Sequence, residues 1–368
     1  MPLVKREPSA PYSPAPMTEK IKVALIGLGG VAVKRNLPVL KKRPEYEVVG
    51  VIDRNEERAA SVAKRFGLPH FERADSLDGI SWLDEVSLIG VGTGPQSHHA
   101  LISSALALGK DVLTEKPFTM TVAEGEELVA QARAGGRILG IVHNFQFASS
   151  TLKLLRDIES GRLGRIKSIV ARQFSNPRRK LPAWYDELPL GLFYDESPHF
   201  FYLVERIAPG PLTFLAADVF PSTTGRETPA YVDVAYRCES PQHGTLPVTV
   251  EMNFETGLSE WHLTVFGEDG LGDIDLFRDI YIHLPNDGEH TTATVIRTTT
   301  MATAQHWGQT ATRGALHLTG KLRYGVDEVL DRFTAALISR TEPEGIGADD
   351  ALEVLKLQHQ VLESHRVL

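Results

Sequence analysis

A hydrophobic run that finishes on charged residues is the first place in the chain where chemistry could occur. Residues 111–113, Asp-Val-Leu, continue through a threonine into Glu115, Lys116 and Pro117. A lysine ammonium at the end of a strand could hold a hydroxyl group and stabilise negative charge developing on its oxygen. Pro117 would keep the backbone of Lys116 extended, and Glu115 could orient the ammonium. The alternative is a solvated strand end without a chemical role.

The glycines near the N-terminus have the spacing of a phosphate-binding turn. Gly27, Gly29 and Ala32 form a G-x-G-x-x-A pattern directly after an apolar run and before a helical one. The first glycine permits a tight turn, the second lets the backbone approach a pyrophosphate, and the alanine allows close packing of helix on strand. The start of the helix supplies free N–H donors. We therefore expect Gly27, Gly29, Gly30, Val31 and Ala32 to bind a dinucleotide, the alternative being a simple glycine turn.

An acidic residue after the next hydrophobic run bears on the choice of dinucleotide. Asp53 follows the glycines by about 20 residues, where a carboxylate accepts hydrogen bonds from the adenosine ribose. A 2′-phosphate would lie against this carboxylate as a like charge, so NAD is expected and NADP is disfavoured. Arg54 could instead hold a 2′-phosphate. The alternative role of Asp53 is to cap the following helix.

These residues lie in a pattern typical of an α/β fold. Each candidate follows a short hydrophobic run that a helical segment separates from the next run, as in a parallel sheet with crossover helices. Loops after such strands share one edge of the sheet, where ligands bind. We therefore predict a Rossmann dinucleotide-binding domain over residues 21–142. Its runs are 21–27, 46–53, 86–92, 111–115 and 137–143, and its helices are 31–43, 55–67, 98–109 and 121–136.

The remainder of the chain has a different pattern of hydrophobic residues. Residues 143–368 predict an α+β domain in which period-two segments form a large open sheet, mostly antiparallel and half exposed on one face. An irregular stretch rich in proline and aromatic residues separates the first strand from a helix over 195–207. The predicted strands are 166–174, 212–220, 230–238, 246–254, 260–267, 272–277 and 279–284, and the other helices are 150–164, 326–339 and 348–366.

The composition limits the class of protein. The 368 residues carry a net charge of −8, which disfavours nucleic acid or an anionic membrane as the main partner. No apolar run approaches the roughly 20 residues that a membrane span needs. The single cysteine, Cys238, allows no disulfide within the chain, so a reducing compartment and a cytoplasmic protein are expected. The proline-rich residues 1–20 predict a disordered lead without a secretory signal.

Several segments share a pattern with one enzyme family. They are GLGGVA, VIDRNEERAASVAKRFG, ALALGKDVLTEKPFTMTVAEGEEL and GRLGRIKSIV. With them the chain resembles the glucose-fructose oxidoreductase / inositol dehydrogenase / MocA family over nearly its whole length from Ile21, and the E-K-P element is the most specific match. The segment GTGPQSHHA is similar to the family's T-P-P-x-x-H, with Gly94 in place of the first proline. The resemblance implies that Thr93, His98, Glu115 and Lys116 contact the cofactor.

The resemblance also implies a catalytic aspartate and histidine four residues apart on one helix. Asp195 and His199 have that spacing, so both side chains lie on one helical face. His199 would be the general base, since its ordinary pKa of about 6.5 suits proton exchange with a hydroxyl. Asp195 would hydrogen-bond the substrate or hold the imidazole; the alternative is a capping aspartate with a core histidine. Ser197 and Tyr202 depart from the family's D-x-G-x-H-x-x-D pattern, which leaves the substrate open.

Four further residues are candidates for ligand contacts. The resemblance implies that Asn144 contacts the cofactor and that Gln146 contacts the substrate, with a structural role as the alternative. Trp184 and Tyr185 follow the basic residues 178–180. That stretch is either a solvated loop or a lid that recognises an anion, and in the second case both aromatic residues would contact substrate. No histidines or cysteines have the spacing of metal ligands, so no metal is expected.

The resemblance implies reversible, NAD-dependent oxidation of a secondary alcohol on a sugar, a sugar derivative or a cyclitol. Lys116, Asp195 and His199 would handle the hydroxyl proton and bind the polyol or keto-sugar. One alternative is an enzyme that recycles a tightly bound NAD within each turnover, for epimerisation or glycoside cleavage. Another is a non-catalytic regulator that binds a dinucleotide. A homodimer or homotetramer is expected, because one face of the predicted sheet would be too apolar to leave in water.

Overall fold

The computed structural model describes residues 19–368 and divides them into two compact units. The N-terminal unit contains the chain up to His143 together with Asp327–Lys356. The C-terminal unit contains Asn144–Val326 and Leu357–Leu368. Residues 1–18, which form most of the predicted disordered lead, lie outside the described residues.

A parallel sheet of six strands forms the centre of the N-terminal unit, in the order β3-β2-β1-β4-β5-β6. The order reverses between β1 and β4, which is the position where sheets of this type bind ligands. The parallel α/β class predicted from the alternating runs is confirmed. The strands are β1 (Ile21–Ile26), β2 (Tyr46–Asp53), β3 (His70–Arg73), β4 (Leu88–Val91), β5 (Asp111–Thr114) and β6 (Leu139–Ile141).

The helices of this unit cover the sheet with small and branched apolar side chains. The segment Asp327–Lys356 brings the final helices onto the same core, where Leu352 and Leu355 pack against Gly125. A Cβ at Gly125 would lie 3.1 Å from both leucines, so glycine allows the close approach. The helices are η1 (Ala32–Asn36), α1 (Leu37–Leu40), α2 (Glu56–Phe66), η2 (Ser81–Glu85), η3 (Pro95–Ser97), α3 (His98–Ala107), α4 (Val122–Gly135), α8 (Val326–Ser339) and the first part of α9 (Ala348–Ser364), which ends in the C-terminal unit.

The C-terminal unit contains a sheet of eight strands in the order β13-β12-β11-β7-β10-β9-β8-β14. Two pairs, β7 with β10 and β8 with β14, are parallel, and the other pairs are antiparallel. The predicted mostly antiparallel sheet is therefore confirmed. Its strands are β7 (Ile166–Phe174), β8 (Leu212–Phe220), β9 (Tyr231–Ser240), β10 (Gly244–Asn253), β11 (Glu260–Gly267), β12 (Gly270–Asp275), β13 (Ile280–Pro285) and β14 (Arg366–Val367).

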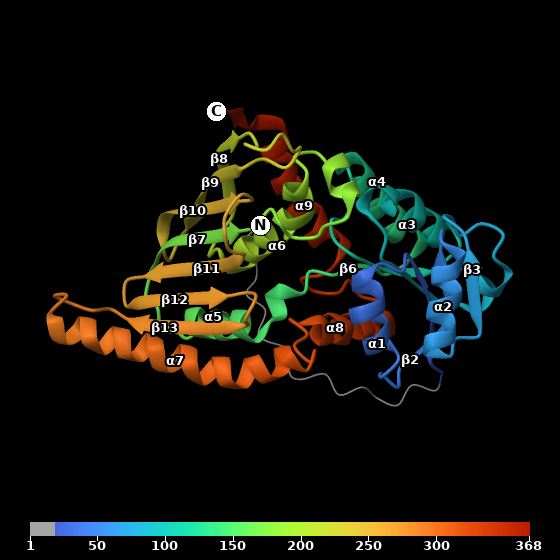
Figure 1. Ribbon diagram of the computed structural model, residues 1–368, viewed down its shortest axis with the longest axis horizontal. Helices are drawn as coiled ribbons and strands as arrows, with labels where there is room; N and C mark the ends of the chain where they lie inside the picture. The colour runs from blue at the N-terminus through green and yellow to red at the C-terminus, as the bar shows by residue number, and fades with distance from the viewer. Residues whose placement is uncertain (1–18) are drawn as a thin grey trace. The chain divides into compact units, whose positions relative to one another are not determined.

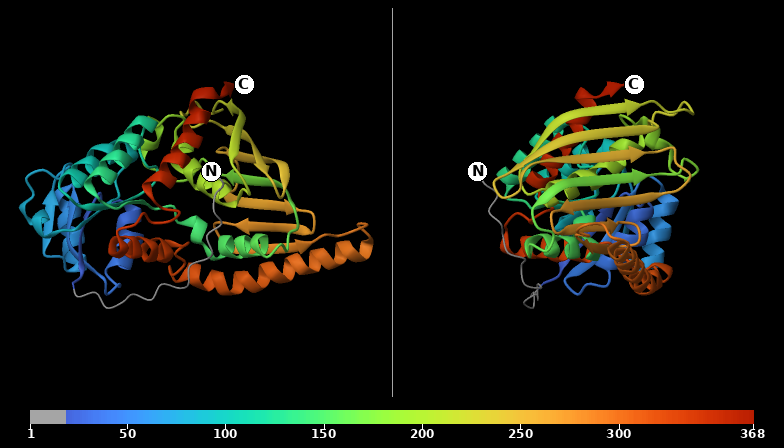
Figure 2. Two further views of the ribbon diagram at one scale, coloured as in Figure 1. Left: turned by 180° about the vertical axis from the view of Figure 1, so that it is seen from behind. Right: turned by 90° about the vertical axis from the view of Figure 1, so that its left-hand side faces the viewer.

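Helices α5 (Ser149–Glu159) and α6 (Leu192–Ile207) pack on one face of this sheet, and the other face is open among the described residues (Figure 2). The open face is less apolar than expected. Its partly exposed positions alternate with buried core positions, and they include charged or titratable residues, among them Arg172, Asp233, Glu251, His262 and Asp273. Short 3-10 helices, η4 (Phe145–Phe147) and η5 (Ala183–Glu187), precede α5 and α6.

A long helix that the sequence patterns did not predict, α7 (Thr292–Leu318), lies along the edge strand β13 (Figure 1). Two glutamines one turn apart on α7 bond the backbone of that strand. Gln305 Oε1 accepts from His283 N at 3.0 Å and its Nε2 donates to His283 O at 2.8 Å. Gln309 makes the same pair of bonds to Tyr281, at 3.1 and 2.5 Å. The two amides therefore replace a neighbouring strand along this edge.

The opposite edge of the sheet is closed by the end of the chain. Strand β14 pairs with β8 in parallel, and Arg366 donates to both carboxylate oxygens of Asp218 at 2.7 and 2.9 Å. Both edges of the eight-stranded sheet are thus occupied by other parts of the C-terminal unit. None of the described helices combines the length and the apolar character needed to cross a membrane.

Candidate functional site

The turn after β1 has the bare backbone that the glycine spacing predicts. Gly27 has φ of +85°, and a Cβ there would lie 2.5 Å from Thr93 Cγ2, so only glycine fits. Gly29 and Gly30 are exposed, and a Cβ on Gly30 would meet no atom within 4 Å. Ala32 is buried. Exposed backbone at the start of a helix fits the pyrophosphate of a dinucleotide.

Asp53 holds this turn from the end of β2. Its Oδ2 accepts a hydrogen bond from Leu28 N at 2.8 Å, and its Oδ1 accepts one from Asn55 N at 2.8 Å. The carboxylate is 4% exposed. The alternative role of capping α2 is wrong, because Asn55 is the N-cap and accepts from Arg58 N at 2.8 Å. The carboxylate instead orders the loop in which the glycines lie.

Arg58 is a member of this site that sequence reasoning missed. Its Nη1 lies 3.3 Å from each carboxylate oxygen of Asp53, and its side chain is half exposed. The sequence signal that could have indicated this contact is the position of Arg58 in the first turn of α2, five residues after Asp53. Arg54 is exposed. The negative charge that was expected to disfavour a 2′-phosphate is therefore partly compensated.

Lys116 is the second residue after the end of β5 and is half-buried. The backbone of Glu115 extends the sheet by one bond, donating from its N to Val91 O at 2.9 Å. The Glu115 carboxylate accepts from Asn36 Nδ2 at 2.8 Å, so the end of η1 fixes its direction. The peptide bond between Lys116 and Pro117 is cis. Glu115 is thus held as an acceptor beside the lysine.

Two buried histidines surround the lysine segment. The ring of His98 contacts Pro117 O at 2.8 Å and Thr93 O at 3.2 Å, so it links the loops after β4 and β5. Burial lowers the pKa of His98, and the charge of Lys116 lowers it further. Burial and Lys116 also lower the pKa of His143, to about 3. Both rings are therefore neutral at pH 7, and the geometry of His98 supports a positioning role.

The second group of candidates lies on α6, which is buried along almost its whole length. The helix begins at a tight contact, where Leu192 N donates to Thr228 Oγ1 at 2.8 Å. Its N-cap is Gly191, where a Cβ would lie 2.2 Å from that same hydroxyl oxygen. Asp195 is therefore not the N-cap of the helix, so the first half of that alternative is wrong. Asp195 and His199 are 8% and 7% exposed.

The imidazole of His199 is fixed on three sides. Its Nδ1 lies 2.9 Å from the hydroxyl oxygen of Tyr202, which in turn accepts from Phe145 N at 3.0 Å. The ring of Phe145 meets it edge to face at 4.9 Å, and the Trp261 ring lies at 5.5 Å. Both aromatic rings are buried. The orientation of the histidine is thus set by packing as well as by a hydrogen bond.

A buried carboxylate next to Asp195 anchors the irregular segment that follows β7. Glu196 forms an ion pair with Arg179 at 2.9 Å and also contacts Gln173. Arg179 is therefore paired with a buried carboxylate, which differs from the solvated basic loop that is one of the two interpretations of this stretch. The rings of Trp184 and Tyr185 stack at 4.0 Å in η5. Burial raises the pKa of the Tyr185 phenol, and the charges of Asp195 and Glu196 raise it further.

Asn144 and Gln146 lie at the start of the C-terminal unit and are both buried. Asn144 Nδ2 donates to Tyr324 O at 2.8 Å, which supports the structural role for this residue. The neighbouring Gly325 has φ of +84°, and a Cβ there would lie 2.3 Å from Asn144 O. The segment that carries Asn144 is thus packed tightly on the loop before α8.

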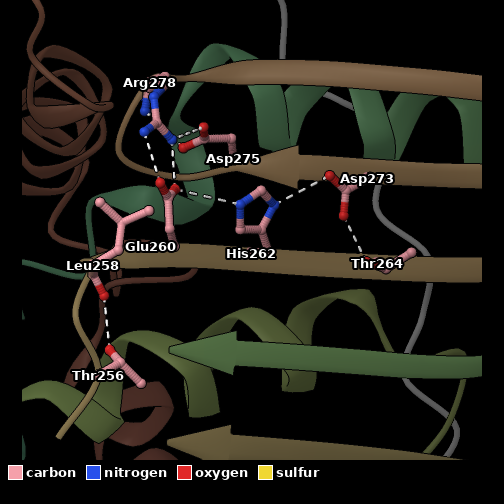
Figure 3. A network of polar contacts seen from close by, with 8 residues as sticks. All are labelled: Thr256, Leu258, Glu260, His262, Thr264, Asp273, Asp275 and Arg278. Carbon is pink, nitrogen blue, oxygen red and sulfur yellow. Dashed lines mark hydrogen bonds and ion pairs between the residues drawn. The ribbon is translucent and has the colours of Figure 1, made fainter. Parts of the chain in front are cut away.

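One group of possible metal ligands occurs among the described residues, on the open face of the eight-stranded sheet (Figure 3). It consists of Glu260, His262 and Asp275. Arg278 already binds both carboxylates, at 2.5 Å from Glu260 and 2.6 Å from Asp275. A hydrogen bond to Asp273 raises the pKa of His262, which favours the charged imidazole over a metal ligand. The group is a set of ion pairs on the sheet surface.

Comparison with protein families matches both units. Residues 21–143 match the oxidoreductase family with an NAD-binding Rossmann fold, and residues 151–271 match the GFO/IDH/MocA C-terminal domain. The chain belongs to the Gfo/Idh/MocA family of oxidoreductases, as the resemblance of its motifs implied. Its first matched region is an NAD(P)-binding domain.

Curated relatives match part of the chain. An uncharacterized oxidoreductase of Schizosaccharomyces pombe is 33% identical over 147 residues, 40% of each chain. The dTDP-3,4-didehydro-2,6-dideoxy-alpha-D-glucose 3-reductase of Streptomyces antibioticus is 31% identical over 156 residues, 41% of this chain and 45% of the relative. The 1,5-anhydro-D-fructose reductase of Ensifer adhaerens is 32% identical over 128 residues, 35% of this chain and 37% of the relative. The alignments thus span less than half of these three proteins.

Solved structures share the fold over nearly the whole chain. GenD2 from gentamicin A biosynthesis, in complex with NAD, has a TM-score of 0.73 at 18% identity and covers 95% of each chain. KijD10, a 3-ketoreductase from Actinomadura kijaniata in complex with NADP and TDP-benzene, has a TM-score of 0.72 at 19% identity. That match covers 95% of this chain and 99% of KijD10. At these identities the likeness describes the fold alone.

Proposed function

We propose that the protein is an NAD(P)-dependent oxidoreductase that interconverts a secondary alcohol and a ketone on a sugar or sugar derivative. One observation carries the proposal. The glycine turn after β1, ordered by the buried Asp53, lies at the carboxyl edge of a parallel sheet in which β5 ends two residues before Lys116. A dinucleotide site and a cationic side chain at one sheet edge are the parts that hydride transfer to a carbonyl needs.

Each candidate residue has a defined part in the proposed reaction. A bound nicotinamide supplies or accepts the hydride. The ammonium of Lys116 stabilises negative charge on the substrate oxygen, and Glu115, fixed by Asn36, orients that ammonium. His199 exchanges the hydroxyl proton, and Asp195 binds a neighbouring substrate hydroxyl.

We further propose that NAD is the preferred cofactor. Asp53 is buried, and each of its oxygens accepts a backbone N–H at 2.8 Å and lies 3.3 Å from Arg58 Nη1, so a ribose hydroxyl would take the place of the longer Arg58 contact. A 2′-phosphate would meet the carboxylate, although Arg58 reduces the repulsion. Relatives of this fold have been solved with NAD and with NADP, so the preference depends on Asp53 and Arg58 rather than on the fold.

The names of the curated relatives support a keto-sugar or polyol as the substrate class, since they include a didehydro-dideoxyglucose 3-reductase and an anhydrofructose reductase. The test is to screen keto-sugars, sugars and cyclitols, free and as nucleotide esters, for a change in NADH absorbance. Turnover of a carbonyl or secondary alcohol with either cofactor is the expected result. Absence of turnover across the panel, with cofactor bound, would contradict the proposal and favour a regulatory role.

A homodimer or homotetramer is proposed as the assembled form. The open face of the eight-stranded sheet is broad, and none of the described helices covers it (Figure 2). It mixes apolar residues such as Val170 with charged ones such as Arg172 and Glu251. A face of mixed character is typical of protein–protein interfaces.

A further inference from the structure

The hydrogen bond between Tyr202 and His199 has a direction that the neighbouring backbone influences. The phenolic oxygen of Tyr202 accepts from Phe145 N at 3.0 Å and lies 2.9 Å from His199 Nδ1. A hydroxyl that accepts one hydrogen bond becomes a stronger donor in the next, because the first bond polarises it. The bond from Phe145 therefore favours donation of the Tyr202 O–H to His199 Nδ1.

The direction of this bond decides which nitrogen of His199 carries the proton. A neutral imidazole has one N–H, and the other nitrogen is an acceptor. If Nδ1 accepts from Tyr202, the single N–H is on Nε2, at the opposite side of the ring. The rings of Phe145 and Trp261 hold the imidazole at 4.9 and 5.5 Å, so a ring flip is opposed by packing.

We propose that Tyr202 is a positioning residue that fixes neutral His199 as the Nε2–H tautomer and thereby makes it a proton donor suited to ketone reduction. This inference rests on the proposed function of His199. It also assigns a role to position 202, where a carboxylate in place of the tyrosine would favour the Nδ1–H tautomer. A carboxylate cannot donate, so it would accept Nδ1–H and leave Nε2 as a base.

The proton balance of the reduction follows from this geometry. As hydride reaches the carbonyl carbon, the carbonyl oxygen takes the proton of His199 Nε2, and the phenolic proton of Tyr202 moves to Nδ1. The imidazole stays neutral, and the negative charge ends on the phenolate oxygen, where the Phe145 N–H stabilises it. A solvent proton then returns to Nε2 and the Nδ1 proton moves back to the phenolate, which restores the starting Nε2–H tautomer. Alcohol oxidation runs the same path backwards and requires the phenolate first.

The tautomer can be measured without any substrate. In the full-length protein with 15N-labelled histidine, at a pH where His199 is neutral, the two ring nitrogens have separate 15N chemical shifts. The His199 signals are assigned by their loss in His199→Gln. We expect Nε2 to be protonated and Nδ1 to be unprotonated in the wild type. A protonated Nδ1 in the neutral ring would overturn the proposal, whatever the enzyme's activity.

Substitution of Tyr202 separates positioning from mere packing. In Tyr202→Phe we expect the tautomer preference to disappear and kcat for reduction to fall at least tenfold, with KM and cofactor affinity within twofold. Tyr236→Phe is the matched control, because it removes another buried phenol of this unit, which donates to Leu357 O at 3.3 Å. Equal effects of the two variants, or a change in KM alone, would contradict the assignment.

A third variant tests the direction of the effect, and the outcomes separate the two proposals. Tyr202→Asp should give the Nδ1–H tautomer and raise the ratio of oxidation to reduction rates over that of Tyr202→Phe. An Nε2–H tautomer in that variant would overturn the mechanism. If the wild type has the expected tautomer but no carbonyl substrate is reduced, the proposed function fails and the tautomer assignment stands. If Tyr202→Phe does not fold, the 15N spectrum of the wild type still shows which ring nitrogen of His199 carries the proton.

Discussion

At the scale of single residues, substitution of Lys116 shows whether it is an active-site lysine or a surface lysine. If the ammonium stabilises charge in the transition state, Lys116→Ala should lower kcat by about 10²- to 10⁴-fold while NAD affinity stays near that of the wild type. His199→Ala should have a similar effect on kcat. The effects of the two substitutions should not add, because a substrate misplaced by the loss of Lys116 can no longer use the proton donor. Steady-state kinetics and cofactor titration of both single variants and the double variant give the answer.

The exposed Lys64, in the last turn of α2, provides the control for this series. Lys64→Ala should leave turnover unchanged and alter stability by at most about 0.5 kcal/mol. If Lys116→Ala behaves in the same way, Lys116 is a strand end without a chemical role.

Asp53 and Arg58 make the cofactor preference a measurable balance of charges. We expect the wild type to bind NAD at least about tenfold more tightly than NADP, a difference of about 1.4 kcal/mol. Arg58→Ala should widen the gap by removing the charge that compensates Asp53. Asp53→Asn should narrow or invert it. Fluorescence titration of both cofactors measures these ratios, and equal affinities in the wild type would mean that the arginines dominate.

His143 should make the protein less stable in mild acid. Its pKa is about 3 in the folded protein and about 6.5 when unfolded, so between these values the unfolded chain binds more protons. Stability from this group is present above about pH 6.5 and is lost as the pH falls, by about 1.4 kcal/mol per unit. Denaturant unfolding between pH 7 and 4 should show a shallower decline for His143→Gln, whereas exposed His306→Gln should keep the wild-type slope.

At the scale of elements, the sequence predicted those parts of the fold that depend on local pattern. The strand–turn–helix around Gly27 is short-range, because the positive φ and the buried Ala32 are fixed by residue type. The same holds for β7 and β11, whose predicted ranges match the observed ones. Contacts between residues distant in sequence left no such signal. Tyr202 accepts a hydrogen bond from the backbone of Phe145, 57 residues earlier in the chain, and no pattern in either segment predicts this contact.

Helix α7 shows why the remainder was not predictable. Its first half is rich in threonine and other β-branched residues, which favour strands. In the structure, threonine hydroxyls donate back to carbonyls four residues earlier, as Thr300 does to Ile296 O at 2.8 Å and Thr303 to Thr299 O at 2.9 Å. The helix is held by its tertiary position along β13, which no window of sequence reveals.

The two glutamines of α7 should contribute measurably to the C-terminal unit. Gln305→Ala combined with Gln309→Ala leaves four backbone groups of β13 without their partners, and each loss costs about 1–3 kcal/mol where water cannot replace the bond. Urea unfolding should show a clear loss of stability. Thr303→Ala is the control on the same helix, since its hydroxyl bonds only α7 itself among the hydrogen bonds of the described residues. An equal loss in both variants would contradict the role of the glutamines.

At the scale of the whole molecule, the open sheet face predicts self-association. Val170 lies on the central strand β7, between Thr249 of β10 and Thr264 of β11. Val170→Arg would bury an unpaired charge in an interface on this face, so it should convert a dimer or tetramer into a monomer, whereas Val170→Thr should not. Sedimentation at micromolar concentration measures the mass. A wild-type monomer under those conditions would contradict the proposed assembly.

The closing of β13 by a helix that follows it in the chain has a consequence for synthesis on the ribosome. Strand β13 ends at Pro285 and α7 ends at Leu318, so 33 residues must still be translated before the helix that carries both glutamines is complete. At about 5–20 residues per second this takes roughly 2 to 7 seconds. During that interval the sheet presents an open edge to other nascent chains. Slow codons within this stretch should therefore lower the yield of native protein, and faster ones should raise it.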